Sequence, residues 1–137
     1  MDRKELIRTF AKALVEVSRG EDKSRAIEAL QTALKDAEES LSLEEGEVQA
    51  LRGIIEALGG RWPSSFTHKL IAAAGDGELL RLLRERLDSW SEDITELTSK
   101  EAQYISLWSE LIGELQTIAI ATEKEVNQTD GQDSSQG

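Results

Sequence analysis

The residue types of a hydrolytic triad occur together in one stretch of this sequence. His68 is the only histidine of the chain, and Ser64, Ser65 and Asp76 lie near it. Histidine can act as a base near neutral pH, because its pKa lies there. On a helix, however, the two serines precede His68 by one turn, whereas Asp76 follows a glycine much further on. A hydrolase that uses His68 is therefore one hypothesis, but a surface or half-buried histidine is the favoured interpretation.

The other signatures of catalysis are missing from the sequence. Adjacent carboxylates at positions 38–39, 44–45 and 92–93 point in different directions on a helix and do not converge. The chain has no Glu-x-x-His pair of a di-iron bundle, no Walker A motif and no G-x-G-x-x-G loop. Without cysteine it offers no thiolate nucleophile and no Cys-ligated zinc. We therefore expect a protein that is not an enzyme and that binds no cofactor and no metal.

The composition restricts the class of protein further. The chain of 137 residues has the length of one domain, and its 39% apolar residues suffice for one core. Its net charge of −11 argues against nucleic acid as a partner, because phosphate recognition needs a basic surface. No apolar run approaches the roughly 18 residues of a membrane-spanning helix. The opening MDRKELIRTF is too charged for a signal peptide. We expect a soluble, cytoplasmic protein without direct membrane insertion.

Apolar residues recur at intervals of three and four along most of the chain, which predicts helices and no strands. The expected helices cover residues 2–19, 22–41, 42–58, 64–74, 76–90 and 98–126. We predict an all-α fold, a bundle of five to six helices that could be orthogonal, with a long C-terminal helix. Residues 1–126 form the single domain. Residues 127–137 have no apolar side chain and are expected to be a disordered polar tail.

Capping residues support these helix boundaries. A capping box pairs a short polar side chain with a glutamate three positions later. Three such pairs open predicted helices: Asp2 with Glu5, Ser42 with Glu45, and Thr98 with Glu101. Ser64 or Ser65 can cap the fourth helix, and Asp76 the fifth.

The glycine- and proline-rich stretch between the third and fifth helices is predicted to be an elbow. Pro63 disfavours helical geometry at Trp62. Gly75 is expected to end the fourth helix in a left-handed conformation. Gly53, inside the third helix, is expected to let another helix approach closely.

The last helix carries two adjacent apolar seams. One seam contains Ile105, Trp108, Ile112, Leu115, Ala119 and Val126, and the other contains Tyr104, Leu107, Leu111 and Ile118. So broad an apolar arc belongs to a helix that is central in a bundle or paired with a partner. The central position is the favoured interpretation.

Tryptophan and arginine are the best candidates for a binding surface, because both are enriched at interface hot spots. Trp108 is predicted to be a core anchor, whereas Trp62, beside the elbow proline, is the best candidate for exposure. Arg81 and Arg84 share a face of the fifth helix, with Arg86 nearby. They could receive an acidic partner, but pairing with glutamates of the same helix is favoured.

Two stretches resemble the delta subunit of F-type ATP synthase. RTFAKALVEVS, at residues 8–18, resembles that family's opening helix, with matches at Arg8, Phe10, Ala11, Ala13 and Leu14. Residues 50–90 resemble its later pattern of helix, elbow and helix, with Phe66, Leu70, Ala73, Gly75, Leu79 and Leu83 in step. Together the two stretches cover about half of the chain.

The resemblance implies a function. In that family, the N-terminal helical domain sits on the catalytic head and receives amphipathic N-terminal helices of alpha subunits in grooves. The matches imply that Phe10, Leu14, Leu79 and Leu83 line such a groove, and Trp62 is a further candidate contact. We therefore expect a non-catalytic helical scaffold or connector, in the form of a short delta-like subunit of the peripheral stalk. Its protein partner would be the alpha subunit.

A self-associating helical protein, such as a phage-derived assembly or accessory factor, is the alternative function. It would use the broad apolar arc of the last helix to contact a second copy of the chain, as a homo-oligomer.

Overall fold

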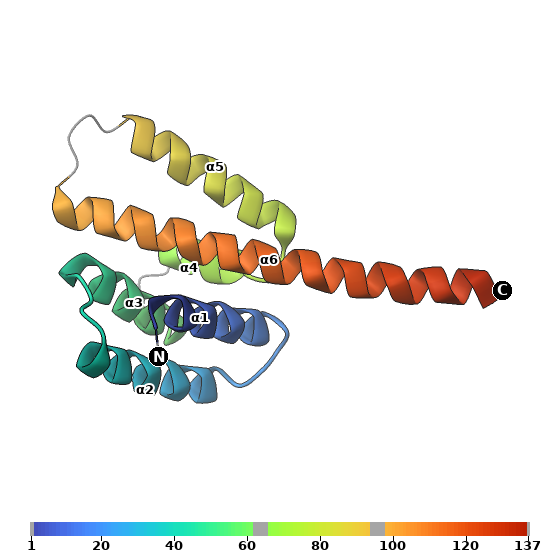
Figure 1. Cartoon of the computed structure of the whole chain (residues 1–137), viewed down its shortest axis with the longest axis horizontal. Coiled ribbons are helices and arrows are strands. Elements are labelled where there is room, and N and C mark those ends of the chain that lie inside the picture. The colour runs from blue at the N-terminus through green and yellow to red at the C-terminus, as the bar shows by residue number, and fades with distance from the viewer. Residues whose placement is uncertain (1, 62–65, 94–97, 137) are drawn as a thin grey trace.

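A computed structural model describes residues 2–61, 66–93 and 98–136 of the chain. Six helices occur in these residues: α1 (Arg3–Ser18), α2 (Lys23–Ser40), α3 (Glu45–Leu58), α4 (Phe66–Ala73), α5 (Gly77–Asp93) and α6 (Ser99–Gln136). No strand occurs in them, so the predicted all-α bundle of five to six helices is confirmed (Figure 1). The expected elbow residues at positions 62–65, with the cap of the fourth helix, lie outside the described residues.

The long helix α6 is central in the bundle. Its first half packs against α1 and α3 on one side and against α5 on the other (Figure 1). The helix α2 lies against α1 and α3, and α4 connects α3 to α5. The principal contacts of α5 are with α4 and α6 alone, whereas α1 contacts α2, α4 and α6. The two helices therefore differ in how many neighbours cover them.

The core of α6 confirms the central position predicted from its two apolar seams. Leu107, Leu111, Ile112 and Leu115 are fully buried, and Trp108 packs against the core from a partly buried position. Residues of both seams are thus used within the chain, because α6 has neighbours on opposite sides.

Most helix starts lie where the capping residues predict them. Asp2 accepts a hydrogen bond from the backbone N–H of Glu5 (2.8 Å), and Thr98 accepts one from that of Glu101 (3.1 Å). The carboxylate of Asp76 accepts two backbone N–H groups in the first turn of α5. These local interactions satisfy N–H groups that have no partner inside the helix.

The start of α3 differs from the prediction. The residue that caps this helix is Glu44 and not Ser42. The backbone N–H of Glu44 donates to the carboxylate of Glu47 (3.3 Å), which also accepts from Arg3 of α1 (2.6 Å). The capping box lies two positions later than predicted, because a contact with another helix holds Glu47 in place.

Two glycines have the backbone conformation that helix ends require, and a third does not. Gly20 and Gly60, after α1 and α3, have φ angles of 94° and 90°. The prediction of a left-handed conformation at Gly75 is wrong, because its φ is not in the positive range. The space at this position is limited instead by Ser18 of α1. A Cβ at position 75 would lie 2.6 Å from the hydroxyl oxygen of Ser18.

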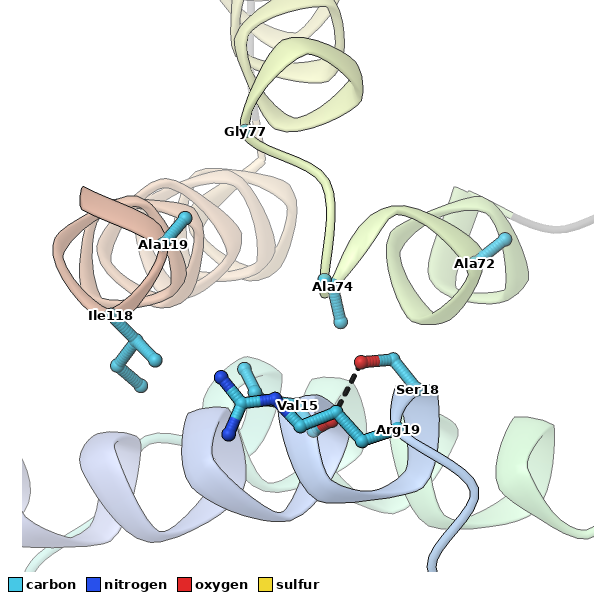
Figure 2. Close-up of a pocket in the computed structure, with 9 residues that line it drawn as sticks. Val15, Ser18, Arg19, Ala72, Ala74, Gly77, Ile118 and Ala119 are labelled. Atoms are coloured by element: carbon cyan, nitrogen blue, oxygen red, sulfur yellow. Dashed lines mark hydrogen bonds between the residues drawn. The ribbon is translucent and has the colours of Figure 1, made fainter. Parts of the chain in front are cut away.

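Gly75 borders a hollow where three helices meet. The hollow has a volume of about 330 Å³ and lies between the end of α1, the turn from α4 to α5, and α6 (Figure 2). Small and apolar side chains such as Val15, Ala74 and Ile118 line it, together with Ser18 and Arg19. No carboxylate and no histidine belongs to its described lining. A general acid or base is therefore not provided by these residues.

The close helix approach predicted at Gly53 occurs at Gly46 instead. A Cβ on Gly53 would have no neighbour within 4 Å. A Cβ on Gly46 would lie 2.7 Å from the Cβ of Gln103 and 2.7 Å from the carbonyl oxygen of Lys100. The N–H of Gly46 also donates to the side-chain oxygen of Gln103 (2.8 Å). The helices α3 and α6 therefore touch at the first turn of α3.

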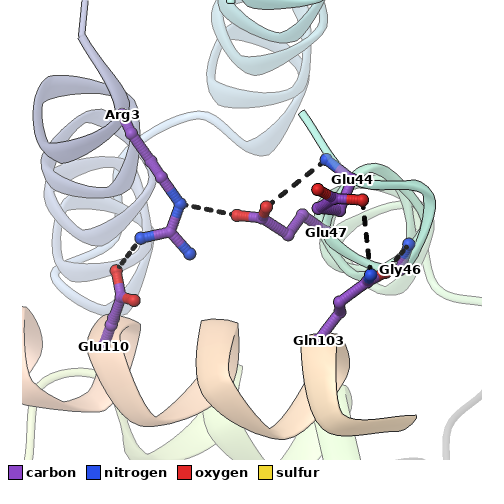
Figure 3. Close-up of polar contacts among 6 residues, drawn as sticks. All are labelled: Arg3, Glu44, Gly46, Glu47, Gln103 and Glu110. Atoms are coloured by element: carbon purple, nitrogen blue, oxygen red, sulfur yellow. Dashed lines mark hydrogen bonds and ion pairs between the residues drawn. The ribbon is translucent and has the colours of Figure 1, made fainter. Parts of the chain in front are cut away.

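Charged and polar groups fasten α6 to α1 and α3 at the edge of the core (Figure 3). The guanidinium of Arg3 donates to Glu47 of α3 and to Glu110 of α6. The amide of Gln103 donates to the carboxylate of Glu44 (3.4 Å). Arg3 of α1 thus connects α3 and α6, two helices that are distant from it in the sequence.

The last helix continues beyond the bundle (Figure 1). It ends at Gln136, past the helix end predicted near Val126, so the predicted domain boundary does not coincide with a helix end. Residues 127–136 contain no apolar residue, so they have no apolar stripe for packing. Disorder of residues 127–137 in solution stays a prediction. No helix in the described part of the chain has the length and apolar character needed to cross a bilayer.

Candidate functional site

The main apolar surface among the described residues lies on α5. Leu79, Leu82 and Trp90 are 43%, 47% and 42% exposed, although each is a large hydrophobic residue. They lie at helical spacing, so they share one side of α5. The adjacent stripe, which contains Leu80 and Leu87, is fully buried. Since α5 has few neighbouring helices, its apolar arc is wider than the surface that they cover.

A groove between α4 and α5 adjoins these exposed residues, and it consists of two hollows. The first has a volume of about 310 Å³ and is lined by Lys69, Ala72, Ala73, Leu79, Leu82, Leu83 and Arg86. The second has a volume of about 230 Å³ and is lined by Phe66, Lys69, Arg86, Leu87 and Trp90. Lys69 and Arg86 belong to both linings, so the two hollows adjoin one another. We call them together the α4–α5 groove.

The groove has an apolar floor and a basic edge. Leu83 and Leu87 are buried beneath it, and short alanines of α4 leave room above them. Lys69 and Arg86 are exposed, and neither forms an ion pair with a described residue. An apolar channel with charged edges can bind an amphipathic helix, since apolar anchors give affinity and edge charges set orientation.

On the outer side of α5, one arginine pairs with two glutamates of the same helix. Arg81 forms ion pairs with Glu78 (2.5 Å) and Glu85 (2.7 Å). The hydrogen bond from Arg81 lowers the pKa of Glu78 below its ordinary value. The predicted pairing with glutamates of the same helix is therefore confirmed for Arg81. Arg84 instead donates to the side-chain oxygen of Gln116 of α6 (3.2 Å).

An aromatic cluster connects one end of the groove to the core. The ring of Trp108 lies 4.8 Å from that of Phe66 and 6.3 Å from that of Trp90, measured between centroids. Trp90 is therefore stacked on a partly buried ring and is itself 42% exposed. A rigid aromatic side chain of this kind can bind a partner at little cost in conformational entropy.

The structure separates the five predicted partner-binding residues. Leu79 is exposed and Leu83 is buried in the floor, and both line the α4–α5 groove. Phe10 and Leu14 are 0% exposed, because neighbouring helices cover their side of α1. They form part of the core and are not open to a partner. Trp62 lies outside the described residues.

Sequence reasoning did not identify Leu82 and Lys69 as site residues. The sequence contains a signal for Leu82 in LLRLLRER at residues 79–86. This stretch has more leucines than one narrow buried stripe of a helix can hold, so one or more of them must be exposed. Lys69 stands beside the apolar stripe of α4 that contains Phe66 and Leu70. Only the packing of α4 beside α5 places it at the edge of a groove.

His68, the candidate catalytic base, is partly buried, and the described residues contain no group of three or more His, Cys, Asp or Glu side chains that could hold a metal ion. Its neighbourhood on α4 contains Thr67 and Lys69. The hydrolase hypothesis thus gains no described metal-binding group, and Ser64 and Ser65, its candidate nucleophiles, lie outside the described residues.

A scan against protein-family models, a search of the curated proteins and a search of the solved structures each found no match for this chain.

Proposed function

We propose that this protein is a non-catalytic helical scaffold or connector that binds an amphipathic helix of a partner protein in the α4–α5 groove. The observation that carries the proposal is the exposure of Leu79, Leu82 and Trp90 along one groove. Contiguous exposed apolar residues on a folded domain commonly mark an interaction site. The bundle beneath supplies a rigid frame, because its core is continuous from α1 to α6.

A short delta-like subunit of the peripheral stalk is the more specific form of this proposal. Of the four residues that the resemblance implies for partner binding, Leu79 and Leu83 line the groove. The other two, Phe10 and Leu14, support the core. The partner helix would therefore bind beside α4 and α5 and not beside α1. Titration with the N-terminal peptide of the alpha subunit tests this form, and no binding at high micromolar concentration would dismiss it.

The general proposal is tested with a designed peptide that has no charged flank. The peptide is an amphipathic helix with one leucine stripe and glutamines on both sides, and binding is measured by isothermal titration calorimetry. We expect binding to the unmodified protein and at least a tenfold weaker affinity for Leu82→Gln. Ile120→Gln is the control, because Ile120 is also an exposed large apolar residue but lies on α6 outside the groove. Equal weakening by both variants would contradict the proposal.

Self-association is the second candidate function, and Ile120 is the observation that favours it. This residue of α6 is 53% exposed. Most of the apolar arc that suggested self-association is buried within the chain, so the remaining surface is small. Light scattering that shows a strict monomer at high concentration would remove this candidate.

A further inference from the structure

We infer that the helix bound in the α4–α5 groove carries carboxylates on both edges of its apolar stripe, near the middle of the bound segment. This inference rests on the proposed function and specifies the chemistry of the partner. Lys69 and Arg86 are the residues that would receive these carboxylates.

The position of the two basic residues supports an acidic partner. Lys69 belongs to α4 and Arg86 to α5, so they stand on opposite banks of the groove. Each lines both hollows, which places the pair where the hollows adjoin. A helix lying along the groove would therefore have a cation on each side of its central turn.

The lack of ion pairs at Lys69 and Arg86 is the second observation. Among the described residues, Arg3, Arg8, Arg52, Arg81 and Lys100 form ion pairs with glutamates, whereas other basic residues, such as Lys12 and Arg25, form none with a described residue. Lys69 and Arg86 form none with a described residue, although the chain has 27 acidic and 16 basic residues. In so acidic a protein, two exposed cations without such a partner beside an apolar groove are available to an external carboxylate.

The length of the groove sets the length of the bound segment. Leu79 and Trp90, which mark its ends on α5, are roughly 16 Å apart along the helix at about 1.5 Å per residue. The partner segment is therefore about three helical turns long, with apolar anchors at intervals of three and four residues. Its carboxylates belong in the central turn, flanking the stripe.

A partner helix fits the charges of the molecule better than an anionic membrane does. A lipid surface would face the whole acidic protein, whose net charge is −11, and would be repelled over a wide area. A single helix contacts only the groove and its two cations. The repulsion from the remainder of the protein is screened beyond about 10 Å in moderate salt.

The test uses three peptides with the same leucine stripe and with glutamate, glutamine or lysine on its two edges in the central turn. Affinities are measured by calorimetry with the full chain at low and at high salt. We expect the glutamate peptide to bind about two- to thirtyfold more tightly than the glutamine peptide at low salt, as two exposed ion pairs provide. The lysine peptide binds most weakly, and added salt reduces the differences.

Charge reversal at both residues supplies the decisive variant. Lys69→Glu with Arg86→Glu should invert the order, so that the lysine peptide binds best. The control is Lys12→Glu with Arg25→Glu, which changes the net charge equally at two exposed residues of α1 and α2. This control should keep the original order.

The remaining outcomes separate failure of the inference from failure of the proposed function. Equal binding of all three peptides would overturn the acidic partner while the groove keeps its function. No binding of any peptide would overturn both. Sedimentation of the unmodified protein with phosphatidylserine vesicles, abolished by the double reversal, would assign the cations to a membrane and overturn the inference. If the unmodified protein is a dimer and the double reversal dissociates it, Lys69 and Arg86 contact a second copy of the chain. That result would also overturn the inference.

Discussion

Both α1 and α5 carry apolar residues at helical spacing, yet these residues differ in how deeply they are buried. Phe10 and Leu14 of α1 are completely buried, whereas Leu79 and Leu82 of α5 are nearly half exposed. The difference follows from the neighbours, since α1 is covered by α2, α4 and α6, and α5 mainly by α4 and α6. Periodicity identifies which side of a helix is apolar. The number of adjacent helices decides whether that side becomes core or surface.

The largest expected effect comes from the same substitution on the two helices. Leu14→Ala removes a fully buried side chain and should lower the free energy of unfolding by about 2 to 5 kcal/mol. Leu82→Ala removes an exposed one and should change it by about 0.5 kcal/mol or less. Urea denaturation followed by circular dichroism measures both. Equal losses would mean that the exposed side of α5 is covered in solution.

Substitutions at two glycines of α3 test whether α6 packs against this helix at Gly46 and leaves Gly53 open. Gly46→Ala should lower the free energy of unfolding by about 1 to 3 kcal/mol, because its methyl group would overlap Gln103 and the backbone at Lys100. Gly53→Ala should raise it by up to about 1 kcal/mol, because alanine favours the helix and meets open space. Thermal unfolding of the two variants should thus give shifts of opposite sign. Two shifts of the same sign would contradict the contact between α3 and α6.

Tyr104 reports on the same contact through its ionisation. Burial against the bundle, followed by the charge of Glu45, raises the pKa of this phenol above its ordinary value near 10. The folded state therefore holds the proton more tightly than the unfolded state. Its contribution to stability is complete below the unfolded pKa and is lost as the pH rises through the folded pKa.

Because Tyr104 is the only tyrosine, its tyrosinate absorbance can be followed without ambiguity. We expect a midpoint above that of a free tyrosine, and a return to the ordinary value in urea. The substitution Gln49→Ala changes the same environment, because it removes the side-chain oxygen that accepts a hydrogen bond from the Tyr104 hydroxyl (2.6 Å). A folded protein with an unshifted midpoint would show that α6 leaves this residue exposed.

The smallest effect is expected for the end of α6. A chain that stops after Val126 removes only residues without apolar side chains, so the free energy of unfolding should change by less than about 0.5 kcal/mol. Chemical denaturation compares the two lengths, and a chain that stops after Glu110 is the contrasting case, since it lacks Leu111, Ile112 and Leu115 of the core. Similar stability of all three chains would refute the central role of α6.

The fold could be predicted largely because its determinants are local. The stripe of α1 and the caps at Asp2, Asp76 and Thr98 depend on residues within a few positions of one another. The errors concern contacts between distant segments. The cap of α3 is Glu44 and not Ser42, and Arg3 of α1 contacts Glu47 of the same capping box. The spacing of residues in the sequence does not predict this contact between two helices.

The candidate site could be predicted only in part, for the same reason. Leu79 and Leu83 were identified because the resemblance to the delta subunit matches these two positions, and both line the groove. Phe10 and Leu14 belong to a clear stripe of α1, but helices from elsewhere in the chain cover it. Whether a stripe is available to a partner depends on tertiary packing, which periodicity does not encode.

The bridge from Arg3 to Glu110 also bears on how the chain folds during synthesis. Its two residues are separated by 107 positions, so the first helix must wait for nearly the whole bundle before α6 covers it. Contacts of such long range slow folding, and an uncovered apolar face can aggregate in the interval. During synthesis, the side of α1 that α6 covers therefore stays exposed until α6 has left the ribosome.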